Sequence, residues 1–192
     1  MARGAPAKPW RLSNVARGAP AKPWRLSNVA RGAPAKPWRL SKSGSLDERY
    51  TAGVDIHALQ KDDLEAVMEL AGHVLSAERA GPFVRSHLER HHLLVAHDRG
   101  EVVGVLGYRT DWFQCTFVSL VSVRPDHRKR GIARALYQAV EGMSPSPRLY
   151  SSTEETNSAA IQMHTALGFQ ASGYIDNLPQ GYRELLFYKR LR

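Results

Sequence analysis

Residues 121–136, VSVRPDHRKRGIARAL, place a cluster of cations directly before a glycine and the start of a helix. The cluster consists of Arg128, Lys129 and Arg130, and Gly131 follows it. A helix start exposes unpaired backbone N–H groups and the positive end of the helix dipole. Glycine also lets the backbone approach a ligand closely. Charge alone would suit a solvated turn equally well, but the combination predicts a cradle for a bulky anion such as a pyrophosphate.

A second stretch with chemical potential is NSAAIQMHTALGF, residues 157–169. Asn157 is a suitable N-cap for a helix, and Gly168 is suited to ending that helix. Histidine has an unperturbed pKa of about 6.5, so the imidazole of His164 could exchange a proton near neutrality. A histidine between a helix and a sheet can equally be a packed, hydrogen-bonded residue. Glu154 and Glu155 precede this helix and add two carboxylates to the region.

Hydrophobic periodicity predicts the elements that must position these side chains. We expect a helix capped by Asp62 that runs to Leu75, and a second helix that starts at Pro82 and ends near His91. Two later helices are expected over 131–143 and 157–167, the latter ending at Gly168. Strands are expected at 53–59, 93–97, 102–108, 113–123, 149–152, 169–175 and 184–188. This order predicts an α/β (α+β) domain, which alone fits several folds.

Charge divides the 192-residue chain into two parts. Residues 1–42 hold ten Lys and Arg and no acid, whereas residues 43–192 carry a net charge of −1. The basic part repeats ARGAPAKPWRLSNV with a period of 14 residues, and each repeat has two prolines and one tryptophan. We therefore expect 1–45 to be a disordered tail and linker, and 46–192 to be one domain. Phosphate binding and base stacking by the tail are an alternative to a passive extension.

Several classes of protein are disfavoured by the remaining residues. Cys115 is the only cysteine, so no intrachain disulfide can form, and a reducing compartment such as the cytoplasm is expected. No apolar stretch is long enough for a membrane-spanning helix, and we expect no membrane partner. In HLERHH, His87 and His91 are four residues apart, but Glu89 is at the wrong offset for the HExxH zinc pattern. We therefore expect His87, His91 and His92 to form a solvated helix end, with no metal.

The two stretches together resemble a known family. Arg128-x-x-Gly131-x-Ala133 is similar to the (Gln/Arg)-x-x-Gly-x-(Gly/Ala) acetyl-CoA motif of the GNAT superfamily of N-acetyltransferases. Residues 157–169 resemble the Asn-x-x-Ala…Tyr-x-x-x-Gly-Phe segment of that family, and the resemblance covers roughly 50–190. It implies a mixed, mostly antiparallel central sheet flanked by helices.

The resemblance also implies acetyl-CoA as cosubstrate. The strand before the motif would align the pantetheine arm, the loop and helix start would hold the pyrophosphate, and Asn157 would contact the cofactor arm. The implied cofactor-binding residues are Val121, Ser122, Val123, Arg128, Lys129, Arg130, Gly131, Ile132, Ala133, Arg134 and Asn157.

The implied catalytic residues depart from the family pattern. His164 stands where the family commonly has a tyrosine that protonates the leaving thiolate, and we assign it that general-acid role. Many relatives have a catalytic Glu on the strand before the motif, but 113–123 contains no acid. Glu154 and Glu155 are the nearest candidates, although attraction of a cationic acceptor suits them better than general-base catalysis.

The resemblance predicts acetyl transfer from acetyl-CoA to a primary amine by direct attack. The segment 174–191 is similar to small-molecule and antibiotic acetyltransferases of the family, which favours a small cationic acceptor such as an aminoglycoside or a polyamine. A protein lysine or N-terminus, and an amino acid or other metabolite, stay open as acceptors. A domain that binds CoA without turnover and a nucleic-acid-binding protein acting through the tail are alternatives. A homodimer is left open.

Overall fold

The computed structural model describes residues 53–191, and the predicted tail and linker at 1–45 lie outside the described residues. The helical elements and strands follow one another in a mixed α/β order. They are β1 Val54–Ala58, the 3-10 turn η1 Lys61–Asp63, α2 Leu64–Gly72, α3 Ala77–Glu89, β2 Leu93–Asp98, β3 Glu101–Trp112, β4 Cys115–Val123, the 3-10 turn η2 Pro125–His127, α4 Ile132–Met143, β5 Arg148–Glu154, α5 Ser158–Ala166, β6 Gln170–Ile175 and β7 Glu184–Arg190.

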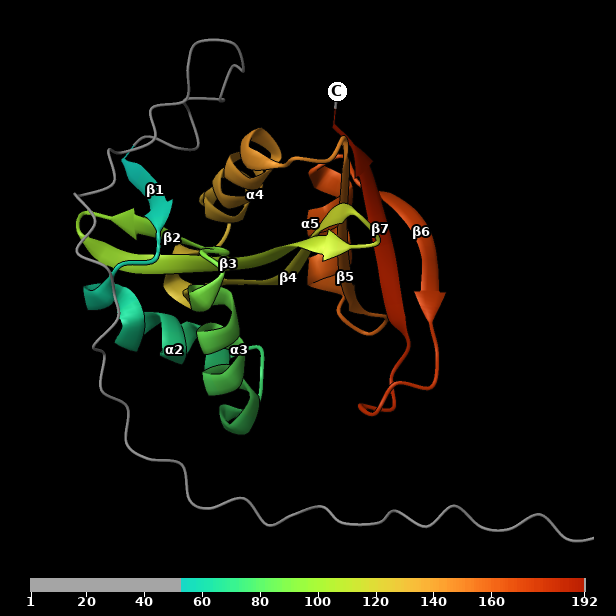
Figure 1. The fold of residues 1–192 in the computed structure, drawn as a ribbon, viewed down its shortest axis with the longest axis horizontal. Helices are drawn as coiled ribbons and strands as arrows, with labels where there is room; N and C mark the ends of the chain where they lie inside the picture. Colours follow the sequence, from blue (N-terminus) through green and yellow to red (C-terminus); the bar gives the residue numbers. More distant parts are fainter. Residues whose placement is uncertain (1–52, 192) are drawn as a thin grey trace, which may run out of the picture. The chain divides into compact units, whose positions relative to one another are not determined.

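The strands form one seven-stranded sheet in the order β1-β2-β3-β4-β5-β7-β6 (Figure 1). All neighbouring pairs are antiparallel except β4 and β5, which are parallel. A parallel pair needs a long crossover, and α4 supplies it between β4 and β5. The predicted mixed, mostly antiparallel sheet flanked by helices is therefore confirmed.

The helices cover opposite faces of this sheet, with α2 and α3 on one face and α4 on the other (Figure 1). Leu120 of β4 belongs to the apolar core beneath α2 and α3, together with Val67 and Val84. Leu136 and Phe169 belong to the other core, which includes the inner face of α4 and residues around α5. Two separate cores thus clamp β4 from both sides, so the strand is held firmly where the site must be built.

Helix α3 corrects a prediction from the sequence. It starts at Ala77 after Ser76 rather than at Pro82, and it ends at Glu89 rather than near His91. Pro82 lies inside the helix, where its ring removes one backbone donor. Ala80 and Val84 are both buried, and their packing against the sheet outweighs that loss.

Two smaller boundaries were also predicted wrongly. The strand expected at 113–123 starts at Cys115, because Phe113 and Gln114 have φ values of 48° and 60° and form a hairpin turn. Asp63, not Asp62, precedes α2, and its carboxylate accepts the Gln60 N–H at 2.9 Å. Within 53–191, no helix has the length and apolar character needed to cross a membrane.

Candidate active site

The sheet opens between β4 and β5. Their ladder contains only the pairs from Thr116–Leu149 to Val118–Ser151. On its other edge, β4 stays paired with β3 as far as Val123, opposite Gly104. The β5-facing edge of β4 therefore leaves the ladder after Val118. Backbone N–H and C=O groups along an unpaired edge can pair with an extended ligand. Val121, Ser122 and Val123, predicted to align the cofactor arm, lie on this edge.

A β-bulge lies at the same point. Gly107 of β3 is opposite Leu120 and Tyr108 is opposite Val118, so Ser119 is the extra residue of β4. A bulge bends its strand and redirects side chains, and bulges are common beside active sites. The bulge here coincides with the end of the β4–β5 ladder, so it accounts for the separation of the two strands.

The predicted anion cradle lies just beyond β4. Gly131 has φ 82°, a left-handed conformation that favours glycine, and it is the N-cap of α4. The first intrahelical bond is from Ala135 N–H to the Gly131 carbonyl, at 3.0 Å. The N–H groups of Ile132, Ala133 and Arg134 precede that bond and are available to an anion. This geometry fits the pyrophosphate role predicted from the sequence.

The cations around the cradle differ in what they contact. Arg128 Nε donates to the Val123 carbonyl at 3.2 Å, and Arg134 Nη2 donates to the Ala166 carbonyl at 3.1 Å. Arg128 therefore also braces the loop against β4, and Arg134 braces the first turn of α4 against the end of α5. Lys129 and Arg130 are exposed, and Lys129 has φ 61°. The exposed pair is better suited to meeting a solvent-facing phosphate.

Asn157 caps α5 as predicted. Its Oδ1 accepts the Ala160 N–H at 3.0 Å. The cap uses the carbonyl oxygen of the side chain and leaves the amide nitrogen available as a donor. The contact with the cofactor arm predicted for Asn157 is compatible with this arrangement and stays a prediction.

His164, the predicted general acid, is enclosed. Only 1% of the residue is exposed, and its ring stacks on Phe187 at 4.5 Å. Nε2 lies 2.9 Å from Ser151 Oγ and 3.2 Å from the Tyr137 hydroxyl. Burial lowers the pKa of His164 to about 4, and the Ala160 carbonyl offsets part of that effect. At neutral pH the ring is uncharged and has no readily released proton, so its predicted role lacks support from these contacts.

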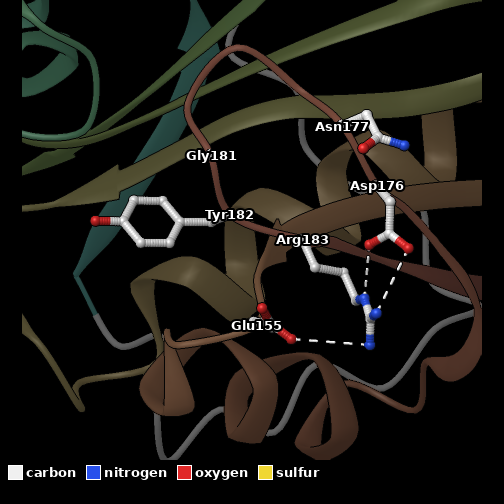
Figure 2. A pocket seen from close by; sticks show the side chains of 6 residues that line it. All are labelled: Glu155, Asp176, Asn177, Gly181, Tyr182 and Arg183. Carbon is white, nitrogen blue, oxygen red and sulfur yellow. Dashed lines mark hydrogen bonds and ion pairs between the residues drawn. The ribbon is translucent and has the colours of Figure 1, made fainter.

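The predicted carboxylates lie at the carboxyl end of β5. Glu154 is exposed, and Glu155 lies 4.0 Å from the Arg183 guanidinium. Asp176 bonds the same guanidinium at 2.8 Å. Figure 2 shows Arg183 between the two acids in a hollow that Tyr182 also lines. The sequence predicted carboxylates that attract a cationic acceptor. The hollow contains both signs of charge, since Arg183, which was assigned no role from the sequence, lies between Glu155 and Asp176.

His87 contradicts the expectation of a solvated helix end. It is 7% exposed and stacks on Phe83 at 3.9 Å. Its Nε2 lies 2.9 Å from the Oγ of Ser119, the bulge residue, which in turn donates to the Gly107 carbonyl at 3.1 Å. Burial lowers the pKa of His87, and the charges of neighbouring residues lower it further.

A local signal for His87 was present in the sequence. Ala80, Val84 and His87 follow one another at spacings of four and three residues, and all three are buried in α3. Residues at these spacings share one face of a helix. The partner Ser119 is 32 positions away, so the sequence held no signal for the contact itself.

A second polar cluster lies at the β1–β2 edge. Potential ligand atoms of His57, Asp63 and His97 lie within 4.8 Å of one another. The two imidazoles stack at 4.4 Å with an interplanar angle of 17°, so their in-plane lone pairs run side by side rather than converge. His97 Nε2 already bonds Asp63 Oδ1 at 2.9 Å. These contacts are those of a partly buried hydrogen-bonded pair, and the absence of a metal stays a prediction.

Comparison with curated proteins identifies an acetyltransferase of amino-acid analogues as a relative. The chain is 34% identical over 99 residues to the L-methionine sulfoximine/L-methionine sulfone acetyltransferase of Pseudomonas aeruginosa. The match covers 47% of this chain and 57% of the relative, so the chain spans little more than half the length of that protein.

Solved structures share the fold. A GNAT-family acetyltransferase from Bacillus cereus is 28% identical, with a TM-score of 0.66 over 72% of this chain and 98% of that one. The structure of yncA from Salmonella typhimurium, solved with its cofactor acetyl-CoA, is 18% identical with a TM-score of 0.57, over 73% and 95% of the two chains. Residues 56–169 match the Acetyltransferase (GNAT) family, and the chain belongs to that family.

Proposed function

We propose that this protein transfers an acetyl group from acetyl-CoA to the primary amine of a small molecule. The observation that carries the proposal is the coincidence of an open β4 edge with a left-handed glycine at the start of α4. The first offers backbone partners to an extended arm, and the second offers N–H groups to a pyrophosphate. Acetyl-CoA contains both parts in one molecule.

The cofactor would lie along residues of two adjoining segments. The open edge of β4 from Ser119 to Val123 would pair with the pantetheine arm. Gly131 and the first turn of α4 would hold the pyrophosphate, with Lys129 and Arg130 adding charge. The thioester would then lie near the bulge, where a backbone N–H of β4 could polarise its carbonyl.

The reaction is a direct displacement. The amine nitrogen attacks the thioester carbonyl, a C–N bond forms, and the C–S bond breaks as CoA leaves as a thiolate. The attacking nitrogen loses one proton as the amide forms, and the thiolate takes up one proton. An acceptor that arrives as an ammonium ion first loses a further proton to solvent. The split in the sheet would hold the two reactants together and so convert a bimolecular step into a nearly unimolecular one.

The acceptor that we favour is an amine that also carries a carboxylate, as an amino acid does. In the hollow beyond β5, Arg183 provides a cation between Glu155 and Asp176. A polycationic amine would meet that positive charge, whereas a zwitterion has a complement for each sign. The relative from Pseudomonas aeruginosa, whose named substrates are amino-acid derivatives, supports the same class.

A polycationic acceptor has one observation in its favour. Glu154 lies opposite Glu184 in the β5–β7 ladder, which brings two carboxylates together at the rim of the sheet. The experiment must therefore include both classes of amine.

The test is acetyl-CoA-dependent thiol release by the full chain against a panel of amines. The panel contains L-methionine sulfone, other amino acids, spermidine, an aminoglycoside and a lysine peptide. We expect the fastest release with an amino acid or its analogue. Fastest release with spermidine or the aminoglycoside would overturn the acceptor class. An absence of thiol release, with acetyl-CoA still bound in calorimetry, would favour an inert CoA-binding domain.

A matched pair of glycine variants tests the cradle. Gly131→Asp adds a side chain and a negative charge at φ 82°, so acetyl-CoA should bind at least about 100-fold more weakly. Gly173→Asp makes the same change at φ 100° in β6, where a Cβ meets no atom within 4 Å, and should leave the affinity unchanged. Equal affinities for the two variants would overturn the cradle assignment.

A further inference from the structure

The reaction needs a group that accepts the proton of the amine, and β4 contains no acid to do so. A proton acceptor must therefore reach the open edge of β4 from another element. The contact that does so joins α3 to the bulge: His87 Nε2 lies 2.9 Å from Ser119 Oγ.

The hydrogen bonds around this pair are one proton short when His87 is neutral. His87 Nδ1 lies 3.0 Å from the Phe83 carbonyl, and Ser119 Oγ lies 3.1 Å from the Gly107 carbonyl. With the His87–Ser119 contact, that makes three hydrogen-bond contacts. A neutral imidazole and one hydroxyl supply only two protons for them, whereas an imidazolium supplies the third. The network is thus built to take up one proton.

The two residues differ in access to solvent. His87 is almost wholly buried, but Ser119 is half-buried and belongs to the β4 edge that leaves the ladder. The hydroxyl can therefore face a substrate while the imidazole stays behind it. The connection between β6 and β7, which lines the charged hollow, extends to the same side of β4 as α3 (Figure 1).

The close packing around His87 requires a glycine at position 107. At Gly107, a Cβ would lie 2.8 Å from Phe83 Cζ and 3.4 Å from His87 Cδ2. Only a residue without a side chain lets both rings lie against β3 and brings the imidazole to the bulge.

We propose that Ser119 and His87 form a proton relay that deprotonates the acceptor amine; this inference rests on the proposed function. The Ser119 oxygen takes the proton from the amine nitrogen as its own hydroxyl proton passes to His87 Nε2. The nitrogen forms its bond to the acetyl carbon, the C–S bond breaks, and the thiolate takes a second proton from solvent. The imidazolium returns its proton to solvent as the product leaves. His87 acts through Ser119 and is a positioning residue in this sense.

The charges around His87 favour loss of the proton from the imidazolium, so the neutral base is regenerated quickly. Arg90, His92 and Arg109 are the charged or titratable groups acting on it, from the end of α3, the loop before β2 and β3. Burial lowers the pKa of His87 below 6.5, the hydrogen bond with the Phe83 carbonyl offsets part of that effect, and all three charges favour the neutral ring. The relay therefore predicts that kcat rises with pH through an acid limb below pH 6.5.

The experiment compares pH profiles of kcat for the wild type and His87→Gln, with the best amine of the panel. His87→Gln should lower kcat by about 100-fold and remove the acid limb, with the KM for acetyl-CoA unchanged. Ser119→Ala should give the same loss, Ser119→Thr should recover most of it, and the double variant should be no worse than either single one. His92→Gln is the matched control, because burial also lowers the pKa of His92, yet its Nδ1 has no hydrogen-bond partner in the described structure. It should keep the acid limb, shifted slightly to higher pH because one of the charges that lower the pKa of His87 is lost.

The failures of the two proposals are distinguishable. If the wild type turns over and His87→Gln keeps its acid limb, the relay is wrong and the acetyltransferase proposal stands. If the wild type turns over no amine, the proposed function fails and the relay fails with it. Circular dichroism of each variant separates loss of the relay from loss of the fold. Should His87→Gln unfold, an unchanged kcat in Ser119→Ala would by itself overturn the relay.

Discussion

The two sides of the β4–β5 split each hold a buried imidazole against a phenylalanine and a strand serine. On the α5 side, His164 stacks on Phe187 and bonds Ser151; on the α3 side, His87 stacks on Phe83 and bonds Ser119. His164 has a further partner, the buried Tyr137 hydroxyl, and its serine is buried too.

The difference lies in where each network leads. The network of His164 is closed, because Ser151 is still paired within the β4–β5 ladder. The network of His87 ends at a bulge residue on the open edge. Under the proposed relay, similar side chains serve different purposes: the enclosed imidazole contributes to stability, and the one that reaches the open edge through a hydroxyl moves protons. The following predictions test that contrast, from the largest effect to the smallest.

Truncation of the His164 side chain should have the largest effect, which is on the free energy of unfolding. His164→Ala removes a stacked ring and leaves two buried hydroxyls without it, so the free energy of unfolding should fall by about 4 kcal/mol. His164→Phe keeps the stacking, and Tyr137 and Ser151 still bond each other at 2.9 Å, so it should cost about 1 kcal/mol. Urea unfolding measures both. A 100-fold loss of kcat in the stable His164→Phe variant would instead restore the general-acid role predicted from the sequence.

Acid should destabilise the protein through the same residue. The pKa of His164 is about 4 in the folded state and about 6.5 when unfolded, so between these values the unfolded chain binds more protons. Stability should therefore fall as the pH drops from 6.5 to 4, with a contribution of about 3 kcal/mol from His164. Urea unfolding at successive pH values measures the slope, and His164→Phe should flatten it. If the stability of that variant depended on pH as steeply as that of the wild type, the loss of stability could not be assigned to His164.

Alanine substitutions at two glycines of β3 disturb the two sides of the sheet separately. Each adds one methyl group, Gly104→Ala on the α4 side and Gly107→Ala on the α3 side. At Gly104, a Cβ would lie 2.9 Å from Ile132 Cγ2 at the start of α4; at Gly107 it would meet Phe83. Each alanine variant should lose about 1–3 kcal/mol through overpacking. Gly104→Ala should weaken acetyl-CoA binding more than it lowers kcat, and Gly107→Ala should do the reverse. Calorimetry measures the acetyl-CoA affinity and steady-state kinetics measure kcat. The same pattern of losses in both variants would contradict the assignment of cofactor binding to the α4 side and proton transfer to the α3 side.

The smallest effect is expected at the charged hollow. Arg183→Gln removes the cation between Glu155 and Asp176 but touches neither histidine. The KM for an amino-acid acceptor should rise by about tenfold, whereas the KM for spermidine should fall or stay constant. Initial rates measured over a range of concentrations of each amine give the two KM values and their ratio. A rise for spermidine alone would indicate a cationic acceptor site.

Local patterns in the sequence sufficed for much of this protein. The order of strands and helices, the Asn157 cap and the glycine at the start of α4 depend on residues within a few positions of one another, where periodicity and capping rules apply. Boundaries were less certain where tertiary packing competes with local preference, as at Pro82 within α3. The family resemblance rested on these local features as well.

Tertiary structure decided the rest, because the deciding contacts join residues distant in sequence. The bulge at Ser119 depends on the register of β4 against β3, and His87 meets it from another element. Tyr137 and Ser151 enclose His164 from two further elements, which changes a plausible acid into a buried neutral ring. Residue types alone could indicate which side chains can exchange protons. Only their packing decides which can reach a substrate, since burial and hydrogen-bond partners set both the pKa and the access of each group.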